Sequence, residues 1–249
     1  MGHDSRMSRL AALATAVVTL LAGSGVSADP QAAAEQAEVE RLRTDWAQLA
    51  RYRDENRRLP PPGAARPRVV FLGDSITESW SLADLGLDQL EVLNRGIGGQ
   101  TTPQMLVRFR QDVVALKPAV VHILAGTNDL AGNTGPTTLE AIENNLSSMV
   151  EIAAANHIAV VLASVLPTVD YPWRRGLEPA GKIAALNDWM RAYARQHKLV
   201  YADYDSAVVD ARGGFKPALA DDGVHPNRAG YAAMGPIARA AIREALAAH

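Results

Sequence analysis

From residue 68 to the end of the chain, short apolar runs rich in β-branched residues alternate with longer stretches of helical periodicity. A short apolar run suits a buried strand, whereas apolar residues spaced three or four apart suit one face of a helix. Strands that are separated by helix-length connections pair in parallel through right-handed crossovers. The pattern predicts a three-layer α/β/α sandwich, with strands at residues 69–72, 90–93, 119–124, 158–163 and 199–202 and helices at residues 102–116, 137–156, 179–197 and 228–247.

A further helical pattern precedes this region, at residues 31–59. It predicts one long helix, which the prolines at 60–62 end because proline cannot continue a helix. Such a helix either packs on the surface of the domain or binds a partner, and we favour packing. The apolar residues that recur at three- and four-residue steps are Val39, Leu42, Trp46, Leu49 and Tyr52.

The amino end has the order of an export signal. Arg6 and Arg9 precede an apolar run at residues 10–21, and small residues follow as far as Ala28. This predicts a signal peptide that is cleaved after Ala28, with Met7 as an alternative start. The other interpretation is an uncleaved anchor or a buried helix, but the run is short for a full span. We expect a bacterial protein of the periplasm or the exterior, without a membrane span once the signal is removed.

Composition narrows the classes of function. The chain has 249 residues and a net charge of -2, so nothing favours a nucleic-acid partner. It has no cysteine, which excludes disulfides, thiolate metal sites and cysteine nucleophiles, and leaves the redox compartment undetermined. We expect a signal peptide at 1–28, a helix and Pro-rich linker at 29–63, and one folded domain at 64–249. The oligomeric state does not follow from the sequence.

A candidate nucleophile follows the first predicted strand. Gly73, Asp74 and Ser75 come directly after the apolar run at 69–72. A serine in this place presents its hydroxyl at the carboxyl end of a sheet, where open α/β folds build their sites. The tripeptide alone is ordinary turn chemistry, so the assignment depends on partners elsewhere in the chain.

A serine hydroxyl needs a base that is held in the right tautomer. Among six histidines, only His225 lies in a loop before a helix with a carboxylate, Asp222, three positions earlier. This spacing allows Asp222 to reach Nδ1 while Nε2 faces the serine. Taken alone, the same spacing is also typical of a solvated loop or a helix cap. His122 falls inside an apolar strand, where a packed core histidine is expected.

Acyl transfer also needs hydrogen-bond donors for the developing oxyanion. Gly99 follows the second predicted strand and Asn128 the third, and the backbone N–H of Ser75 is a further candidate. Glycine clusters and Thr-Asn-Asp also make plain turns and caps. A phosphate-binding loop is disfavoured because the glycines around Gly98 have neither the dinucleotide nor the P-loop spacing.

These segments, in this order, resemble the SGNH (GDSL) hydrolase superfamily. The residues that give the superfamily its name match Ser75, Gly99, Asn128 and His225, and Asp222 matches the acid of its triad. The sequence of residues 94–102, together with that of 126–128 and 225–231, resembles the subgroup that contains platelet-activating-factor acetylhydrolase catalytic subunits. The resemblance covers residues 68–246. The α/β-hydrolase elbow is disfavoured because Thr77 replaces its final glycine.

The resemblance implies a serine esterase with a Ser75–His225–Asp222 triad and an oxyanion hole formed by Ser75, Gly99 and Asn128, without metal or cofactor. We expect a flavodoxin-like, parallel, five-stranded sheet of order 2-1-3-4-5. The substrate is a short-chain, acetyl-type ester, with an O-acetylated polysaccharide as the alternative and a non-catalytic binding module as a remote third. Residues 166–178 fit no regular element and are expected to line the site. The candidates for substrate contact are Asp74, Trp173 and Arg174. Trp80 is a further aromatic residue that suits either sugar stacking or core packing.

Overall fold

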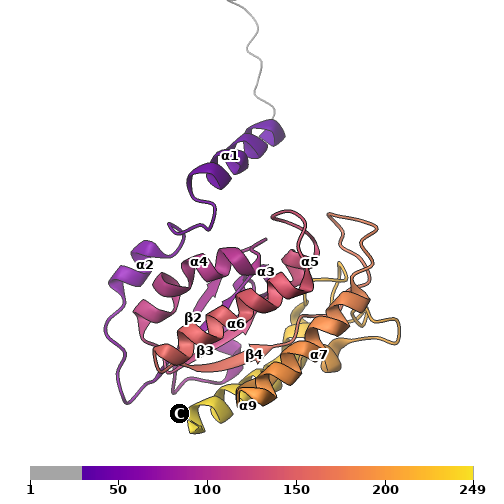
Figure 1. Cartoon of the computed structure of the whole chain (residues 1–249). Coiled ribbons are helices and arrows are strands. Elements are labelled where there is room, and N and C mark those ends of the chain that lie inside the picture. The colour runs from indigo at the N-terminus through magenta and orange to yellow at the C-terminus, as the bar shows by residue number, and fades with distance from the viewer. Residues whose placement is uncertain (1–29, 249) are drawn as a thin grey trace, which may run out of the picture. The chain divides into compact units, whose positions relative to one another are not determined.

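The computed structural model describes residues 30–248, so the predicted signal peptide lies outside the described residues. Two compact units divide the chain between Thr44 and Asp45. The described part of the first unit is the helix α1 (Pro30–Thr44). The second unit, from Asp45 onward, holds the sheet and the residues to which the sequence assigns chemistry (Figure 1).

A five-stranded parallel sheet of order β2-β1-β3-β4-β5 forms the centre of this unit, which confirms the predicted fold and strand order. Gly73 at the end of β1 pairs with Gly96 of β2 and with Leu124 of β3. The three strands therefore end level with one another, and the segments after them start at the same edge of the sheet. The strands are β1 (Arg68–Gly73), β2 (Glu91–Gly96), β3 (Val120–Leu124), β4 (Ala159–Ala163) and β5 (Val200–Ala202).

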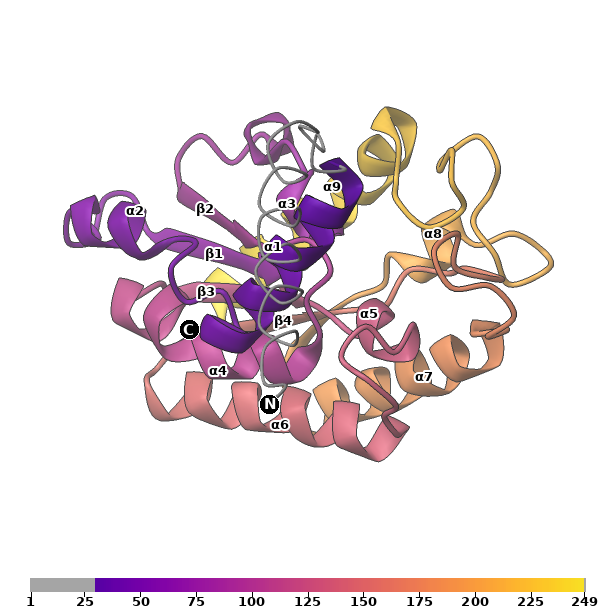
Figure 2. The ribbon, with the colours of Figure 1, turned by 90° about the horizontal axis from the view of Figure 1, so that it is seen from above.

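Helices cover both faces of the sheet, because alternate residues of each buried strand point to opposite sides. Val70 and Leu72 pack into the apolar layer beneath α4 (Thr102–Asp112), α6 (Leu139–Ala155) and α7 (Ala180–Gln196). Val69 and Phe71 pack on the other face, where the cover is α3 (Ser75–Glu78), η1 (Leu82–Leu85), α8 (Asp205–Val208) and α9 (Arg228–Ala247). Figure 2 shows the sheet between these layers, with the short helices α3 and α5 (Thr127–Leu130) at its carboxyl end.

The long helix predicted over residues 31–59 is wrong. After α1 the chain makes tight turns, with Gln48 in the left-handed region at φ 54°, and then forms the short helix α2 (Arg53–Arg58). The Asp45 carboxylate accepts the N–H groups of Leu49 and Ala50 at 2.7 and 2.9 Å, which competes with helix continuation.

Side chains of the sheet domain hold this turn in place. The carbonyls of Trp46, Ala47 and Leu49 accept hydrogen bonds from the amides of Gln104, Gln100 and Gln111, at 2.7, 2.8 and 2.8 Å. Carbonyls that are bound in this way are not available to a helix. We call residues 45–58 the N-terminal strap; the compact unit thus starts at Asp45 and not at the predicted boundary of residue 64.

Two smaller expectations are confirmed. The predicted helix at 102–116 is present as α4 and a following 3₁₀ turn, η2 (Val114–Leu116). Residues 166–178 contain no helix or strand, only an isolated bridge between Tyr171 and Arg174. Among the described helices, none is both long and apolar enough to cross a membrane.

Candidate active site

The first element of the site is the sharp turn that places Ser75 at the start of α3. Asp74 caps this helix by accepting the Ile76 N–H at 2.9 Å. Gly73 has no alternative here, because a Cβ on it would lie 2.0 Å from Thr77 Oγ1. The turn leaves Ser75 half-buried with its Oγ 2.9 Å from Nε2 of His225.

The loop before α9 brings His225 and Asp222 together. His225 Nδ1 lies 2.6 Å from Asp222 Oδ2, while Asp222 Oδ1 accepts the backbone N–H groups of Val224 and His225 at 2.9 and 2.7 Å. Burial alone would raise the pKa of Asp222, but these hydrogen bonds hold that pKa below its ordinary value. The neighbouring Asp221 instead accepts a hydrogen bond from Asn227 Nδ2 at 2.9 Å. The spacing of three thus joins the histidine to Asp222 as expected.

On the other side of Ser75 lies the loop after β2. A Cβ built on Gly98 would lie 3.8 Å from the Ser75 Cβ, so the two residues are neighbours. Gly98 donates its N–H to Glu78 Oε2 at 2.8 Å, which ties the loop to the last residue of α3. Gly99 adopts φ 75°, in the left-handed region that glycine occupies without strain.

Asn128, on the short helix α5 after β3, completes this side. Its Nδ2 donates to the Gln100 carbonyl at 3.1 Å, and its Oδ1 accepts Nδ2 of Asn133 at 2.8 Å. Asn133 Nδ2 also donates to the Gly99 carbonyl at 3.2 Å. One amide group therefore touches both Gly99 and Asn128, the two residues predicted as oxyanion donors outside the nucleophile.

Two residues that sequence reasoning missed hold this side, Asn133 and Glu78. Neither falls in a segment that marks the family resemblance. A signal for Asn133 is visible only once the fold is known, because it lies one turn beyond α5 and returns to the loop after β2. For Glu78 the signal is its place at the end of α3, on the same helix as Ser75.

The predicted contact residues differ in where the structure places them. Trp173 is 46% exposed, and its ring centroid lies 5.9 Å from that of His225. Its Nε1 donates to Asn133 Oδ1 at 3.2 Å. Arg174 is exposed, but its Nη1 donates to the Ala131 and Gly132 carbonyls at 3.0 and 2.6 Å. Trp173 thus lies at the rim of the site, and Arg174 supports the loop beside it.

The expectation that Asp74 contacts the substrate is wrong. Its exposed fraction is 0%, so it cannot contact a substrate from solvent. Burial raises the pKa of the Asp74 carboxyl to about 7, against the hydrogen bond from Ile76 and the charge of His225, which lower it. Burial also raises the pKa of Asp129 to about 6, even though Thr102 donates two groups to that carboxylate. Two carboxyls that bind protons unusually tightly therefore lie beneath the site.

His122 lies in the core as predicted. It is fully buried, its Nε2 is 2.7 Å from the Tyr204 hydroxyl, and it stacks on Phe71 at 4.5 Å between centroids. Burial lowers the pKa of His122 to about 3, so it is neutral at physiological pH. Within residues 30–248, no three acidic or histidine side chains are grouped so as to hold a metal ion.

The fold and this arrangement define a class of protein. A hydroxyl hydrogen-bonded to an imidazole, an imidazole hydrogen-bonded to a carboxylate, and amide groups beside the hydroxyl are the parts that acyl transfer requires. Residues 71–233 match the model of the GDSL-like Lipase/Acylhydrolase family. The chain belongs to this family and is a carboxylic ester hydrolase.

Several proteins are similar to this chain in sequence or structure. The chain is 42% identical to a GDSL-like lipase from Bacteroides thetaiotaomicron, whose crystal structure it matches with a TM-score of 0.74 over 82% of this chain and 98% of that one. It is 28% identical over 216 residues to an acetylxylan esterase from Geobacillus stearothermophilus, covering 71% of this chain and 93% of the relative. It is 27% identical over 164 residues to the uncharacterized lipoprotein YqeF of Bacillus subtilis, and the alignment spans 59% of each.

Proposed function

We propose that the protein hydrolyses short-chain, acetyl-type carboxylic esters through an acyl-enzyme on Ser75. The observation that carries this proposal is the line of two hydrogen bonds from Ser75 through His225 to Asp222, 2.9 and 2.6 Å long, in a chain of an esterase family. His225 Nε2 takes the serine proton while Oγ attacks the ester carbonyl. Asp222 holds the imidazole in the tautomer with hydrogen on Nδ1 and stabilises the imidazolium that forms.

The intermediate then collapses by a balanced proton transfer. The imidazolium returns its proton to the alkoxide oxygen of the leaving alcohol as the carbon–oxygen bond breaks, which leaves Ser75 acylated. Water attacks the acyl-enzyme while His225 takes one of its protons, and the carboxylic acid leaves as Oγ recovers a proton. No other reactant is needed.

The oxyanion of both tetrahedral intermediates is assigned to the N–H groups of Ser75 and Gly99 and to the Asn128 amide. Ser75 is the first residue of α3, so its N–H has no partner within the helix. One N–H of the Asn128 amide is engaged by the Gln100 carbonyl, and the other remains for a ligand. Donors held in this way need no rearrangement when charge develops.

A short acyl group fits the surroundings of Ser75. Its described neighbours on the oxyanion side are Gly98 and the polar groups of Glu78 and Asn133, which offer little apolar surface. Each buried CH₂ of an acyl chain gains about 0.8 kcal/mol only where such surface removes it from water. We therefore expect kcat/KM to be highest for acetyl to butyryl esters.

The alcohol side has a second candidate, an O-acetylated polysaccharide. The similarity to an acetylxylan esterase over 71% of the chain favours it. Export would bring the enzyme to such polymers, and we propose export from the signal pattern at residues 1–28. Amino-terminal sequencing of the protein from its native host tests this, and we expect the mature chain to start at Asp29. Recovery of the intact amino end in the cytoplasm would contradict it.

A fluorophosphonate probe tests the mechanism directly, since it traps an activated serine. We expect the wild-type protein to be labelled at Ser75 in a peptide map and to hydrolyse 4-nitrophenyl acetate. Ser75→Ala is expected to lose the label and more than about a thousandfold of kcat, and Ser206→Ala, an exposed serine of α8, serves as the matched control. A Ser75→Ala protein with a tenth of wild-type kcat would falsify the assignment.

A further inference from the structure

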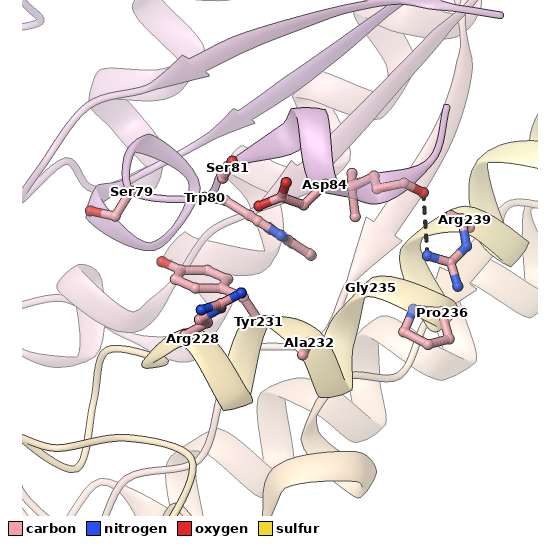
Figure 3. A pocket seen from close by; sticks show the side chains of 11 residues that line it. Ser79, Trp80, Ser81, Asp84, Arg228, Tyr231, Ala232, Gly235, Pro236 and Arg239 are labelled. Atoms are coloured by element: carbon pink, nitrogen blue, oxygen red, sulfur yellow. Dashed lines mark hydrogen bonds between the residues drawn. The ribbon is translucent and has the colours of Figure 1, made fainter. Parts of the chain in front are cut away.

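A large cavity lies beside the triad and not on it. It has a volume of about 610 Å³, which falls within the range of sites that hold drug-sized ligands. Figure 3 shows its two walls: Trp80 and Asp84 belong to the turn after α3 and to η1, and Arg228 and Tyr231 belong to the first turns of α9. Arg239 closes the far end, where its Nη1 donates to the Leu85 carbonyl at 3.3 Å.

Each wall follows a triad residue closely in the sequence. Ser79 lines the pocket and lies four residues after Ser75, directly after the end of α3, which corresponds to about 6 Å along the helix axis. Arg228 lines the opposite wall three residues after His225. Tyr231 links the two, since its hydroxyl donates to the Ile76 carbonyl at 2.8 Å. The pocket therefore lies next to the two segments that carry Ser75 and His225.

The lining mixes polar groups with apolar surface. Ser79, Ser81, Asp84, Arg228 and Arg239 provide hydroxyl, carboxylate and guanidinium groups. Among the described residues, Asp84 and the two arginines form no ion pair; Arg239 has one nitrogen engaged by the Leu85 carbonyl, and its other donors remain for a ligand.

The apolar surface comes mainly from small residues of α9. Trp80 is only 4% exposed and packs against the Tyr231 ring at 5.4 Å, as a core aromatic, whereas Ala232 and Pro236 are exposed on the α9 wall. An acyl chain would require continuous apolar walls. Several hydroxyls on a rigid ring match this lining better, because each can pair with a carboxylate or guanidinium while the ring covers the apolar surface.

We propose that this pocket binds the alcohol part of the substrate, and that this part is an oligosaccharide whose sugar units beyond the acetylated one occupy the pocket. This inference rests on the proposed ester hydrolysis at Ser75 and adds the substrate class. It predicts that sugar units that do not react contribute to transition-state binding, so kcat/KM rises with the length of the saccharide.

The test is a length series in one chemistry, from acetylated xylose to acetylated xylotetraose, with 4-nitrophenyl acetate beside it. For the wild type we expect kcat/KM to rise about tenfold along the series, equivalent to about 1.4 kcal/mol. Arg228→Gln removes the exposed guanidinium at the mouth, and Ala232→Leu fills the exposed part of the α9 wall. In both variants we expect the increase of kcat/KM along the series to be at least about fivefold smaller than in the wild type. The control is Arg243→Gln, which changes an exposed arginine of α9 outside the pocket and should keep the wild-type increase of kcat/KM.

The outcomes separate this inference from the proposed mechanism. A wild-type protein that hydrolyses 4-nitrophenyl acetate but shows no rise with saccharide length overturns the pocket assignment and leaves the triad intact. The same holds if the rise survives in both pocket variants, or if kcat/KM grows instead with acyl length. A protein that hydrolyses no ester and takes no fluorophosphonate overturns the mechanism. Binding of unacetylated xylotetraose to Ser75→Ala, measured by calorimetry and weakened by Arg228→Gln, supports the pocket independently of turnover.

Discussion

The two sides of Ser75 are built in different ways. On the base side, His225 and Asp222 belong to one turn, and both backbone N–H groups that fix the carboxylate come from residues 224 and 225. On the oxyanion side, Gly99 and Asn128 follow different strands and are joined by Asn133. Asp222 is 42% exposed, whereas Asn128 is only 2% exposed. The base side is a local turn, and the oxyanion side is a network of tertiary hydrogen bonds.

This difference predicts how each side responds to substitution. When the key contact of a local turn is lost, its effect on catalysis is lost completely, but the rest of the fold is unaffected. A network distributes its positioning over several hydrogen bonds, so single changes at its periphery have graded effects. Substitutions on each side, and where the two sides meet, therefore test the contrast.

The largest effect is expected from Asp222→Asn. Asparagine keeps an oxygen for the N–H groups of residues 224 and 225, but it presents an NH₂ group to His225 Nδ1. Two donors cannot pair, so the imidazole is driven to the wrong tautomer, and kcat should fall by roughly 10³–10⁴. Asp221→Asn, which changes a carboxylate bound to Asn227, is the control and should lose little. Steady-state kinetics with 4-nitrophenyl acetate decides; the reverse order of the two variants would show that the triad uses Asp221.

Asn128→Ala should have the next largest effect, because it removes one proposed oxyanion donor outright. The expected loss in kcat is about 10²–10³, with a much smaller change in KM. Asn145→Ala on α6, an asparagine that donates to Thr102 Oγ1 at 3.0 Å, provides a comparison outside the site. Equal losses in the two variants would mean that Asn128 acts only on folding, which urea unfolding of both proteins reveals.

Asp74 lies where the two sides meet, directly before Ser75, and its effect should appear in stability. A carboxyl with a pKa of about 7 when folded and 3.8 when unfolded binds its proton more tightly in the folded state. The free energy of unfolding then falls as pH rises from about 4 to about 7. Asp74→Asn keeps an oxygen for the Ile76 N–H but cannot ionise. Relative to wild type, it should gain about 2 to 3 kcal/mol between about pH 5 and pH 8.

Urea unfolding of both proteins at the two pH values measures this gain. Asp88→Asn, an exposed carboxylate, should follow the wild type at both. An Asp74→Asn protein whose stability tracks the wild type across the range would show that Asp74 ionises normally.

Asn133→Asp tests the network itself. The substitution keeps an oxygen for Trp173 Nε1 but replaces the NH₂ group that holds Asn128 and Gly99. Both residues lose a partner, and a negative charge appears beside the proposed oxyanion. We expect kcat to fall about 10- to 100-fold, increasingly so as the new carboxylate ionises with rising pH. Asn144→Asp introduces the same charge on the exposed face of α6, and a similar pH profile there would exclude a positioning effect.

The contrast also explains what the sequence predicts and what it does not. Asp222 and His225 are recognised together because their contact spans three residues. The sheet order follows from strands and helices that alternate with clear periodicity. Glycine at 73 and 99 is recognisable as turn chemistry, even though its reason, a 2.0 Å clash in one case and φ 75° in the other, needs coordinates.

The features that the sequence does not predict correctly share a different cause. Asn133 and Glu78 act across 34 and 20 residues of sequence, and no local pattern marks them. The N-terminal strap has apolar residues at helical spacing, but three glutamines of the domain bind its carbonyls. The sequence suggests that Asp74 contacts substrate because it is a carboxylate beside the predicted nucleophile, and only its burial shows otherwise. In each case a tertiary hydrogen bond or burial overrides the local pattern.

The smallest effect is expected at the far end of the network, in the strap. The hydroxyl of Tyr52, which is 6% exposed, donates to the carbonyl of Gly96, two residues before the loop beside Ser75. Tyr52→Phe leaves that carbonyl buried without its partner but keeps the ring, over which Arg51 and Arg95 lie at 4.8 and 4.7 Å. We expect a loss of about 1 kcal/mol in the free energy of unfolding and a fall in kcat of only a few-fold. Tyr193→Phe on α7, a half-buried tyrosine stacked on His197, is the matched control and should change neither. A Tyr52→Phe protein with full stability but kcat reduced a hundredfold would show that the strap acts on the site directly and not through a shared network.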